Sequence, residues 1–131
     1  MDRITLKSRY RYDDKGALCK FYSVTQRKGI KVWVRLDTAY EQYTNQIKAH
    51  KGKCAPAVMS ELLPVYEKNK QIGYGFITQK ARVRDVTYSN KLINDLERRY
   101  KKVFGKPYID FHEYNVGMIG KRLVYVDLEE W

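Results

Sequence analysis

The sequence predicts an α+β fold for a single domain of 131 residues. Residues 3–36 alternate apolar and polar positions in three short segments separated by turn sequences, which is typical of antiparallel strands. Two later segments, 38–51 and 89–104, place apolar residues three or four positions apart, as amphipathic helices do. Short apolar segments follow at 116–119 and 123–126. This order of strands, helix, strands, helix and hairpin is an α+β pattern.

The first three strands are expected at residues 3–12, 17–25 and 30–36. The turn sequences between them, 13–16 and 26–29, both end in glycine. Turns this short join neighbouring antiparallel strands. The three segments are therefore expected to form a meander.

A helix and two more strands are expected next. Asp37 can cap a helix over residues 38–51, and Gly52 is expected to end it. Strands are expected at 58–66 and 72–79, on either side of a polar link. The sheet then has five antiparallel strands with one helix inserted after the third.

Ser89 or Asn90 can cap a second helix that ends near Phe104, before Gly105 and Pro107. Its apolar positions form one stripe, whereas basic residues gather on the other face toward its end. We expect the stripe to pack in the core and the basic face to lie in solvent, where it could meet phosphate groups.

The last predicted element is a hairpin of residues 116–119 and 123–126, joined by a tight turn that contains Gly120. Because its strands must pair, Asn115 and Asp127 are expected to lie close together. Two oxygen ligands beside a further carboxylate suit a Mg²⁺ ion that carries the phosphates of a nucleotide.

The net charge is +11, and it is uneven: residues 1–107 carry +14 and residues 108–131 carry −3. A basic protein attracts polyanions such as nucleic acid and acidic protein surfaces. No apolar run is long enough for a membrane span, and no secretory signal begins the sequence. Cys19 and Cys54 form neither a metal-binding pattern nor a disulfide framework. We therefore expect a cytoplasmic protein that has no membrane partner.

Residues 110–115, Asp-Phe-His-Glu-Tyr-Asn, resemble the catalytic loop of kinases, in which asparagine follows aspartate by five positions. Residues 123–128, Leu-Val-Tyr-Val-Asp-Leu, resemble the apolar strand that leads into the kinase metal-binding aspartate. The motif is most similar to small kinase-like proteins encoded by bacteriophages, and it also resembles the aminoglycoside-phosphotransferase branch. This resemblance implies a truncated protein-kinase-like fold. Residues 1–80 would form the N-lobe sheet with its helix, and residues 81–131 the second helix and a catalytic-loop-like hairpin, without a full C-lobe.

The resemblance also implies roles for the residues of this motif. Asp110 would be the catalytic base that orients an acceptor hydroxyl. Asn115 and Asp127 would hold Mg²⁺ on the phosphates of ATP. The hinge that meets the adenine through backbone groups would be Gln79, Lys80 and Ala81.

The phosphate-binding residue of the third strand would be Arg35, and its helix partner would be Glu41. Here the sequence departs from the family, because kinases carry lysine at that strand position and arginine is a planar fork rather than a point charge. Lys31 can take the role only if the register of the strand differs. Gln46, the alternative to Glu41, carries no charge.

Other departures are the absence of a glycine-rich loop between the first two strands and the end of the sequence four residues after Asp127. They favour a degenerate kinase or pseudokinase, encoded by a phage and located in the host cytoplasm, that binds ATP and Mg²⁺ weakly and modulates a host protein. If active, it would be an ATP-dependent phosphotransferase. A homo-oligomer is also expected, since a kinase-like body without its C-lobe would expose apolar surface. The alternatives are a basic nucleic-acid-binding module and a charge-driven inhibitor of a host protein.

Overall fold

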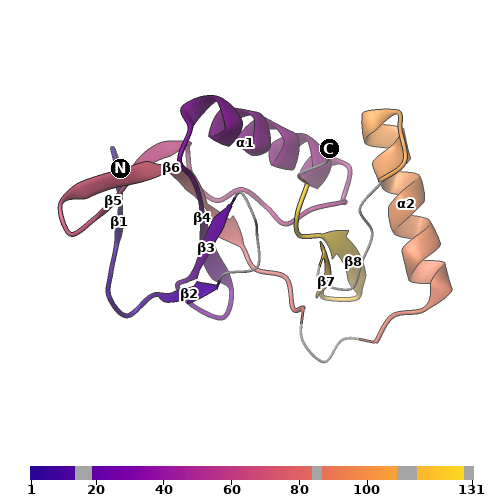
Figure 1. Ribbon diagram of the computed structural model, residues 1–131. Helices are drawn as coiled ribbons and strands as arrows, with labels where there is room; N and C mark the ends of the chain where they lie inside the picture. Colours follow the sequence, from indigo (N-terminus) through magenta and orange to yellow (C-terminus); the bar gives the residue numbers. More distant parts are fainter. Residues whose placement is uncertain (14–18, 84–86, 109–114, 129–131) are drawn as a thin grey trace. The chain divides into compact units, whose positions relative to one another are not determined.

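The computed structural model describes residues 1–13, 19–83, 87–108 and 115–128. It shows an α+β fold with two helices, a six-stranded mixed sheet and a two-stranded hairpin (Figure 1). The elements in chain order are β1 (Ile4–Leu6), β2 (Arg11–Asp13), β3 (Lys20–Ser23), β4 (Lys28–Trp33), α1 (Leu36–Lys51), β5 (Leu63–Glu67), β6 (Lys70–Gln79), α2 (Asn90–Phe104), β7 (Val116–Ile119) and β8 (Arg122–Tyr125).

The chain divides into two compact units. The sheet unit contains residues 1–44 and 58–80, and the helix–hairpin unit contains residues 45–57 and 81–131. One boundary therefore falls inside α1, and another falls between Lys80 and Ala81.

The sheet has the strand order β1-β5-β6-β4-β3-β2. An antiparallel meander is confirmed, because β2 pairs with β3 and β3 with β4, but its first strand is β2 rather than the whole of residues 3–12. After α1 the chain returns as β5 and β6, and β6 pairs with β4 in the centre of the sheet. The sequential order of meander, helix and two strands is therefore as expected.

The prediction of one strand over residues 3–12 is wrong. A turn, in which the amide of Tyr10 donates to the carbonyl of Lys7 at 2.9 Å, separates β1 from β2. β1 lies at the opposite edge of the sheet and pairs in parallel with β5, placing Ile4 beside Val65. The sheet is consequently six-stranded and mixed rather than five-stranded and antiparallel. Burial explains the difference, since this pairing removes Ile4 and Leu6 from water.

Apolar clusters form on both faces of this sheet. Successive residues of a strand point to opposite faces, so Val32 and Trp33 of β4 enter different clusters. Val32 packs in the cluster that includes β1 and β5, whereas Trp33 packs with Phe76 of β6 and Ala39 of α1. The first turns of α1 thus cover the Trp33 face of the sheet.

In the helix–hairpin unit, local signals set the ends of α2. The Ser89 hydroxyl accepts a hydrogen bond from the amide of Leu92 at 3.3 Å, and Gly105 ends the helix with a φ of 72°. Both predictions are confirmed. The predicted hairpin is confirmed as well, with Val116 opposite Tyr125 in the β7–β8 ladder.

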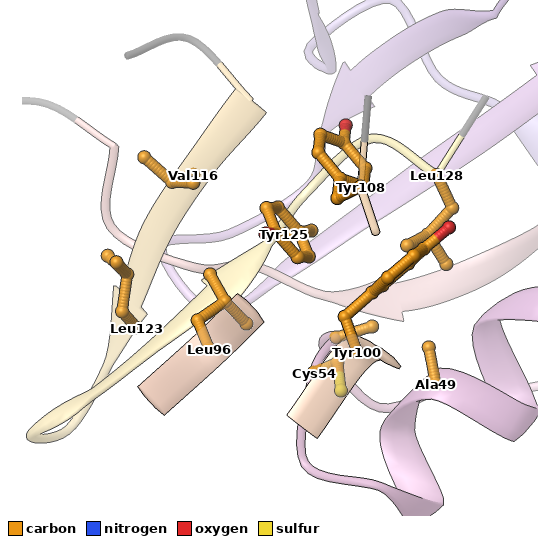
Figure 2. Packing of buried hydrophobic residues seen from close by; sticks show 10 residues of the cluster. Ala49, Cys54, Leu96, Tyr100, Tyr108, Val116, Leu123, Tyr125 and Leu128 are labelled. Carbon is orange, nitrogen blue, oxygen red and sulfur yellow. The ribbon is translucent and has the colours of Figure 1, made fainter. Parts of the chain in front are cut away.

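The core of this unit consists of side chains from α1, α2, the hairpin and the segments between them (Figure 2). Its buried members are Ala49, Cys54, Ala55, Leu96, Tyr100, Tyr108, Val116, Leu123, Tyr125 and Leu128. The apolar stripe predicted for α2 supplies Leu96 and Tyr100, so its assignment to the core is confirmed. No helix within the described residues has the length and apolar character needed to cross a membrane.

Candidate functional site

The β7–β8 hairpin brings the two predicted metal ligands together in the backbone. The amide of Val126 donates to the carbonyl of Asn115 at 2.8 Å, which extends the ladder one pair beyond Val116 and Tyr125. Asp127 follows directly in the chain. The prediction that Asn115 and Asp127 lie close together is therefore confirmed for their backbones, and Asn115 is buried.

Tyr108, two residues before the predicted catalytic loop, contacts the same end of the hairpin. Its hydroxyl donates to the carbonyl of Asp127, and its ring stacks on Tyr125 with ring centroids 3.8 Å apart. Tyr108 and Asn115 are thus both hydrogen-bonded to residues 126–127. Asp110 of the predicted catalytic loop lies outside the described residues, as does His112.

The described residues contain no group of three or more His, Cys, Asp and Glu side chains that could hold a metal ion. Asp127 and Asn115 can offer one carboxylate and one amide oxygen. Mg²⁺ commonly takes one or two carboxylates and completes its shell with water and phosphate oxygens. These two oxygen types are ligands that such an ion takes only together with water and phosphate oxygens.

Gly117, two residues after Asn115, allows the backbone of residues 81–82 to come close to β7. A side chain on Gly117 would lie 3.0 Å from the carbonyl oxygen of Arg82 and 2.9 Å from the Cβ of Ala81. Arg82 exchanges two backbone hydrogen bonds with Met118 of β7, at 2.8 and 2.9 Å. The connector that leaves the predicted hinge is therefore tied to the hairpin that carries Asn115.

Arg35 lies beyond the end of β4, in the link to α1. Its guanidinium donates to both carboxylate oxygens of Asp37, at 3.1 and 2.7 Å, and both side chains are exposed. These hydrogen bonds raise the pKa of Arg35 and lower the pKa of Asp37. α1 begins at Leu36, so Asp37 lies in its first turn rather than before it. Glu41, the expected partner of Arg35, is exposed on α1.

Lys31 is the cation that lies inside β4. It pairs in register with Phe21 and Phe76 and is half-buried. Two positions separate it from Trp33, so both side chains belong to the face that α1 covers. β4 ends at Trp33, so Lys31 lies inside the strand and Arg35 lies beyond it. The sequence of residues 30–36 gives no sign that the strand ends there.

The predicted hinge falls at the boundary of the two units. Gln79 ends β6 opposite Lys28, and Ala81 begins the helix–hairpin unit. Between them, the Lys80 amide donates to the carbonyl of Arg27 at 2.9 Å, and its ammonium donates to the Ser23 hydroxyl at 3.0 Å. Gln79 and Lys80 are thus fixed to the meander.

The two cysteines differ in environment. Cys54 is fully buried in the core of the helix–hairpin unit, and Cys19 is partly exposed beside β3. Burial raises the pKa of the Cys54 thiol, although the positive charges of Arg99 and Arg122 act in the opposite direction. Cys54 is therefore a structural thiol in the folded protein.

We expect a thiol reagent to modify Cys19 in the native protein and Cys54 only after unfolding, because thiolate formation and access both limit the reaction. Labelling of a Cys19→Ser variant, followed by mass spectrometry with and without urea, measures Cys54 alone. Equally fast labelling in both conditions would contradict the burial of Cys54.

A scan of protein-family models finds no match to this sequence, and a search of the curated proteins finds no similar sequence. The function is therefore inferred from the residues of the chain itself.

Proposed function

We propose that this protein binds a Mg²⁺–nucleotide at a reduced kinase-like site, with Asn115 and Asp127 as the metal ligands. The observation that carries the proposal is that Tyr108 and Asn115 both contact the residues that follow β8. Tyr108, two residues before Asp110, and Asn115, the last residue of the motif, are both hydrogen-bonded to residues 126–127. This arrangement supports a site at the residues that follow the β7–β8 hairpin.

Both proposed metal ligands belong to the helix–hairpin unit. The carboxylate of Asp127 supplies negative charge for the cation, and the side-chain oxygen of Asn115 supplies a neutral ligand. The phosphates of a nucleotide complete the shell and are drawn by the net charge of +11. A metal held by so few protein ligands binds weakly without its nucleotide, so we expect metal and nucleotide to bind together.

Most residues that the kinase resemblance assigns to the phosphates and the adenine belong to the sheet unit, and Ala81 belongs to the helix–hairpin unit. In this proposal Lys31 replaces Arg35 as the cation of the third meander strand, because Lys31 lies within β4 and the Arg35 fork is occupied by Asp37. Glu41 is retained as the proposed helix partner of the cation. The backbone groups of Gln79 and Ala81 are retained as the proposed adenine contacts.

We further propose that the protein acts as a pseudokinase on a host protein. Exposed apolar side chains on the sheet unit support a role in protein contact: Val34, Leu36 and Tyr40 are 72%, 51% and 60% exposed in and just after the β4–α1 link. Side chains of this size are unfavourable in water and favour burial against a partner. A second copy of the chain could cover the same side chains.

Calorimetric titration with ATP, with and without Mg²⁺, tests the nucleotide site. We expect binding that requires the metal. In Asp127→Ala the affinity should fall about tenfold or more, and Asn115→Ala should weaken it in the same direction. Glu97→Ala is the matched control, because it removes an exposed carboxylate from α2 of the same unit.

Absence of ATP binding by the wild-type protein, or binding that ignores both Mg²⁺ and Asp127→Ala, would overturn the proposed site. Phosphate transfer that disappears in Asp110→Ala would show an active kinase instead of a pseudokinase.

A further inference from the structure

We propose that the C-terminal ends of α1 and α2 form a basic surface that binds the phosphate backbone of duplex nucleic acid without reading its sequence. The surface belongs to the helix–hairpin unit. Its six members, all exposed, are Lys48, Lys51, Lys53, Arg98, Lys101 and Lys102.

Three contacts bring the two basic segments side by side. The ammonium of Lys48 lies 5.2 Å from the centroid of the Phe104 ring. The guanidinium of Arg99 donates to the carbonyl of Lys53 at 3.1 Å. Gly52 lies so close to Val103 that a side chain on Gly52 would overlap it. Residues 46 to 56 positions apart in the sequence therefore share one surface.

Arg99 organises this surface rather than serving as one of its binding groups. Besides Lys53, its guanidinium donates to the carbonyl of Leu123 in β8 at 2.8 Å. Burial lowers the pKa of Arg99, which reflects its partial removal from water. The arginine thus joins α2 to the end of α1 and to the hairpin, and the exposed lysines around it remain in solvent.

The surface concentrates positive charge. Neither residues 48–53 nor residues 98–106 contain an acidic side chain. The nearby acidic residue Asp95 lies outside these segments and forms a salt bridge with Arg98 at 2.9 Å. Cations in the last turn of a helix stabilise its carbonyl end. That effect accounts for Lys48, Lys51, Lys101 and Lys102, whereas Lys53 and Arg98 lie outside the last turns. The surplus of charge fits a polyanion.

The described part of the helix–hairpin unit has no exposed large apolar side chain, which favours a nucleic acid over a protein as the partner of the basic surface. Among the described residues, the exposed large apolar side chains all belong to the sheet unit. Protein interfaces depend on aromatic and apolar anchors, and single-stranded nucleic acids bind by stacking on aromatic rings. The rings nearest the basic surface are packed instead: Tyr100 is 3% exposed, and Phe104 lies beneath Lys48.

The side-chain types indicate backbone contacts. Five of the six members are lysines, which act as mobile point charges on phosphates. Sequence reading in the grooves relies on arginine, asparagine and glutamine forks directed at base edges. A surface of lysines therefore fits the repeated phosphates of a duplex, where contacts position the protein without selecting a sequence.

Fluorescence anisotropy with short labelled duplexes tests this proposal. We expect two unrelated sequences to bind equally, with affinity falling steeply between about 50 and 200 mM salt and a log–log slope of about −4. A Lys101→Gln/Lys102→Gln variant should reduce the slope by about 2, because each phosphate contact contributes about 0.9. DNA and RNA duplexes are measured in parallel to identify which helix geometry binds.

The matched control is Lys68→Gln/Lys70→Gln, which removes the same charge from the exposed β5–β6 turn of the sheet unit. It should bind duplexes nearly as the wild type does. An equal loss in both double variants would overturn the assignment to this surface. Tighter binding to single strands than to duplexes would overturn the assignment of a duplex as the ligand. Tighter binding to polyglutamate would overturn the nucleic-acid proposal and indicate an acidic protein instead. Asp127→Ala should leave duplex binding unchanged, so failure of the nucleotide site and failure of this proposal are distinguishable.

Discussion

Replacing Tyr125 with alanine is expected to lower the free energy of unfolding by about 4 kcal/mol, within the range for buried aromatic residues. Tyr125 is fully buried at the centre of the helix–hairpin core. Its ring stacks on Tyr108 and meets Tyr100 edge to face, with centroids 3.8 and 5.3 Å apart (Figure 2). Truncation removes both ring contacts and leaves a cavity between α2 and β8.

The measurement is urea denaturation followed by circular dichroism, with Tyr125→Phe as the matched control. The phenylalanine retains both ring contacts and should cost much less than the alanine. A loss below about 1 kcal/mol in Tyr125→Ala would contradict the central position of this ring. The result also concerns the proposed site, because Tyr108 packs on Tyr125 and donates to the carbonyl of Asp127.

Gly75→Ala is expected to destabilise the sheet unit by about 3 kcal/mol, at the upper end of the usual cost of overpacking. Alanine is normally preferred to glycine inside a strand. At this position, however, a Cβ atom would lie 2.0 Å from the carbonyl oxygen of Lys31. β6 is paired with β4 on one side and β5 on the other, so it cannot move away without breaking a ladder.

Gly105→Ala separates this steric effect from backbone conformation. Gly105 has a φ of 72°, and a Cβ atom added to it would have no neighbouring atom within 4 Å. Its replacement should cost only the conformational penalty of about 1 kcal/mol. Urea midpoints of the two variants give the comparison. If Gly75→Ala were neutral or stabilising, the close approach of β6 to β4 would be wrong.

Several elements could be predicted from the sequence because their determinants are local. Ser89 and Gly105 set the ends of α2 through one hydroxyl and one left-handed backbone position. The turn at Gly120 fixes the β7–β8 register, and that register places Asn115 beside residues 126–127. The closeness of the two proposed metal ligands therefore followed from the sequence, whereas Asp110 lies outside the described residues.

The tertiary structure decided the features that depend on distant partners. The alternation from Ile4 to Tyr12 continues across a turn, so periodicity cannot show that β1 leaves the meander to pair with β5. Burial against Val65, more than fifty residues away, selects that pairing. The end of β4 separates Lys31 in the strand from Arg35 in the link.

The basic surface also depends on contacts between residues that are far apart in the sequence. Each of its segments is visible in the sequence as a run of lysines and arginines near a helix end. Only the contacts of Arg99 with Lys53 and of Lys48 with Phe104 join the two runs. Local chemistry sets the ends of helices and turns within a few residues. Which strands and surfaces meet is decided by burial and hydrogen bonding between residues that the sequence places far apart.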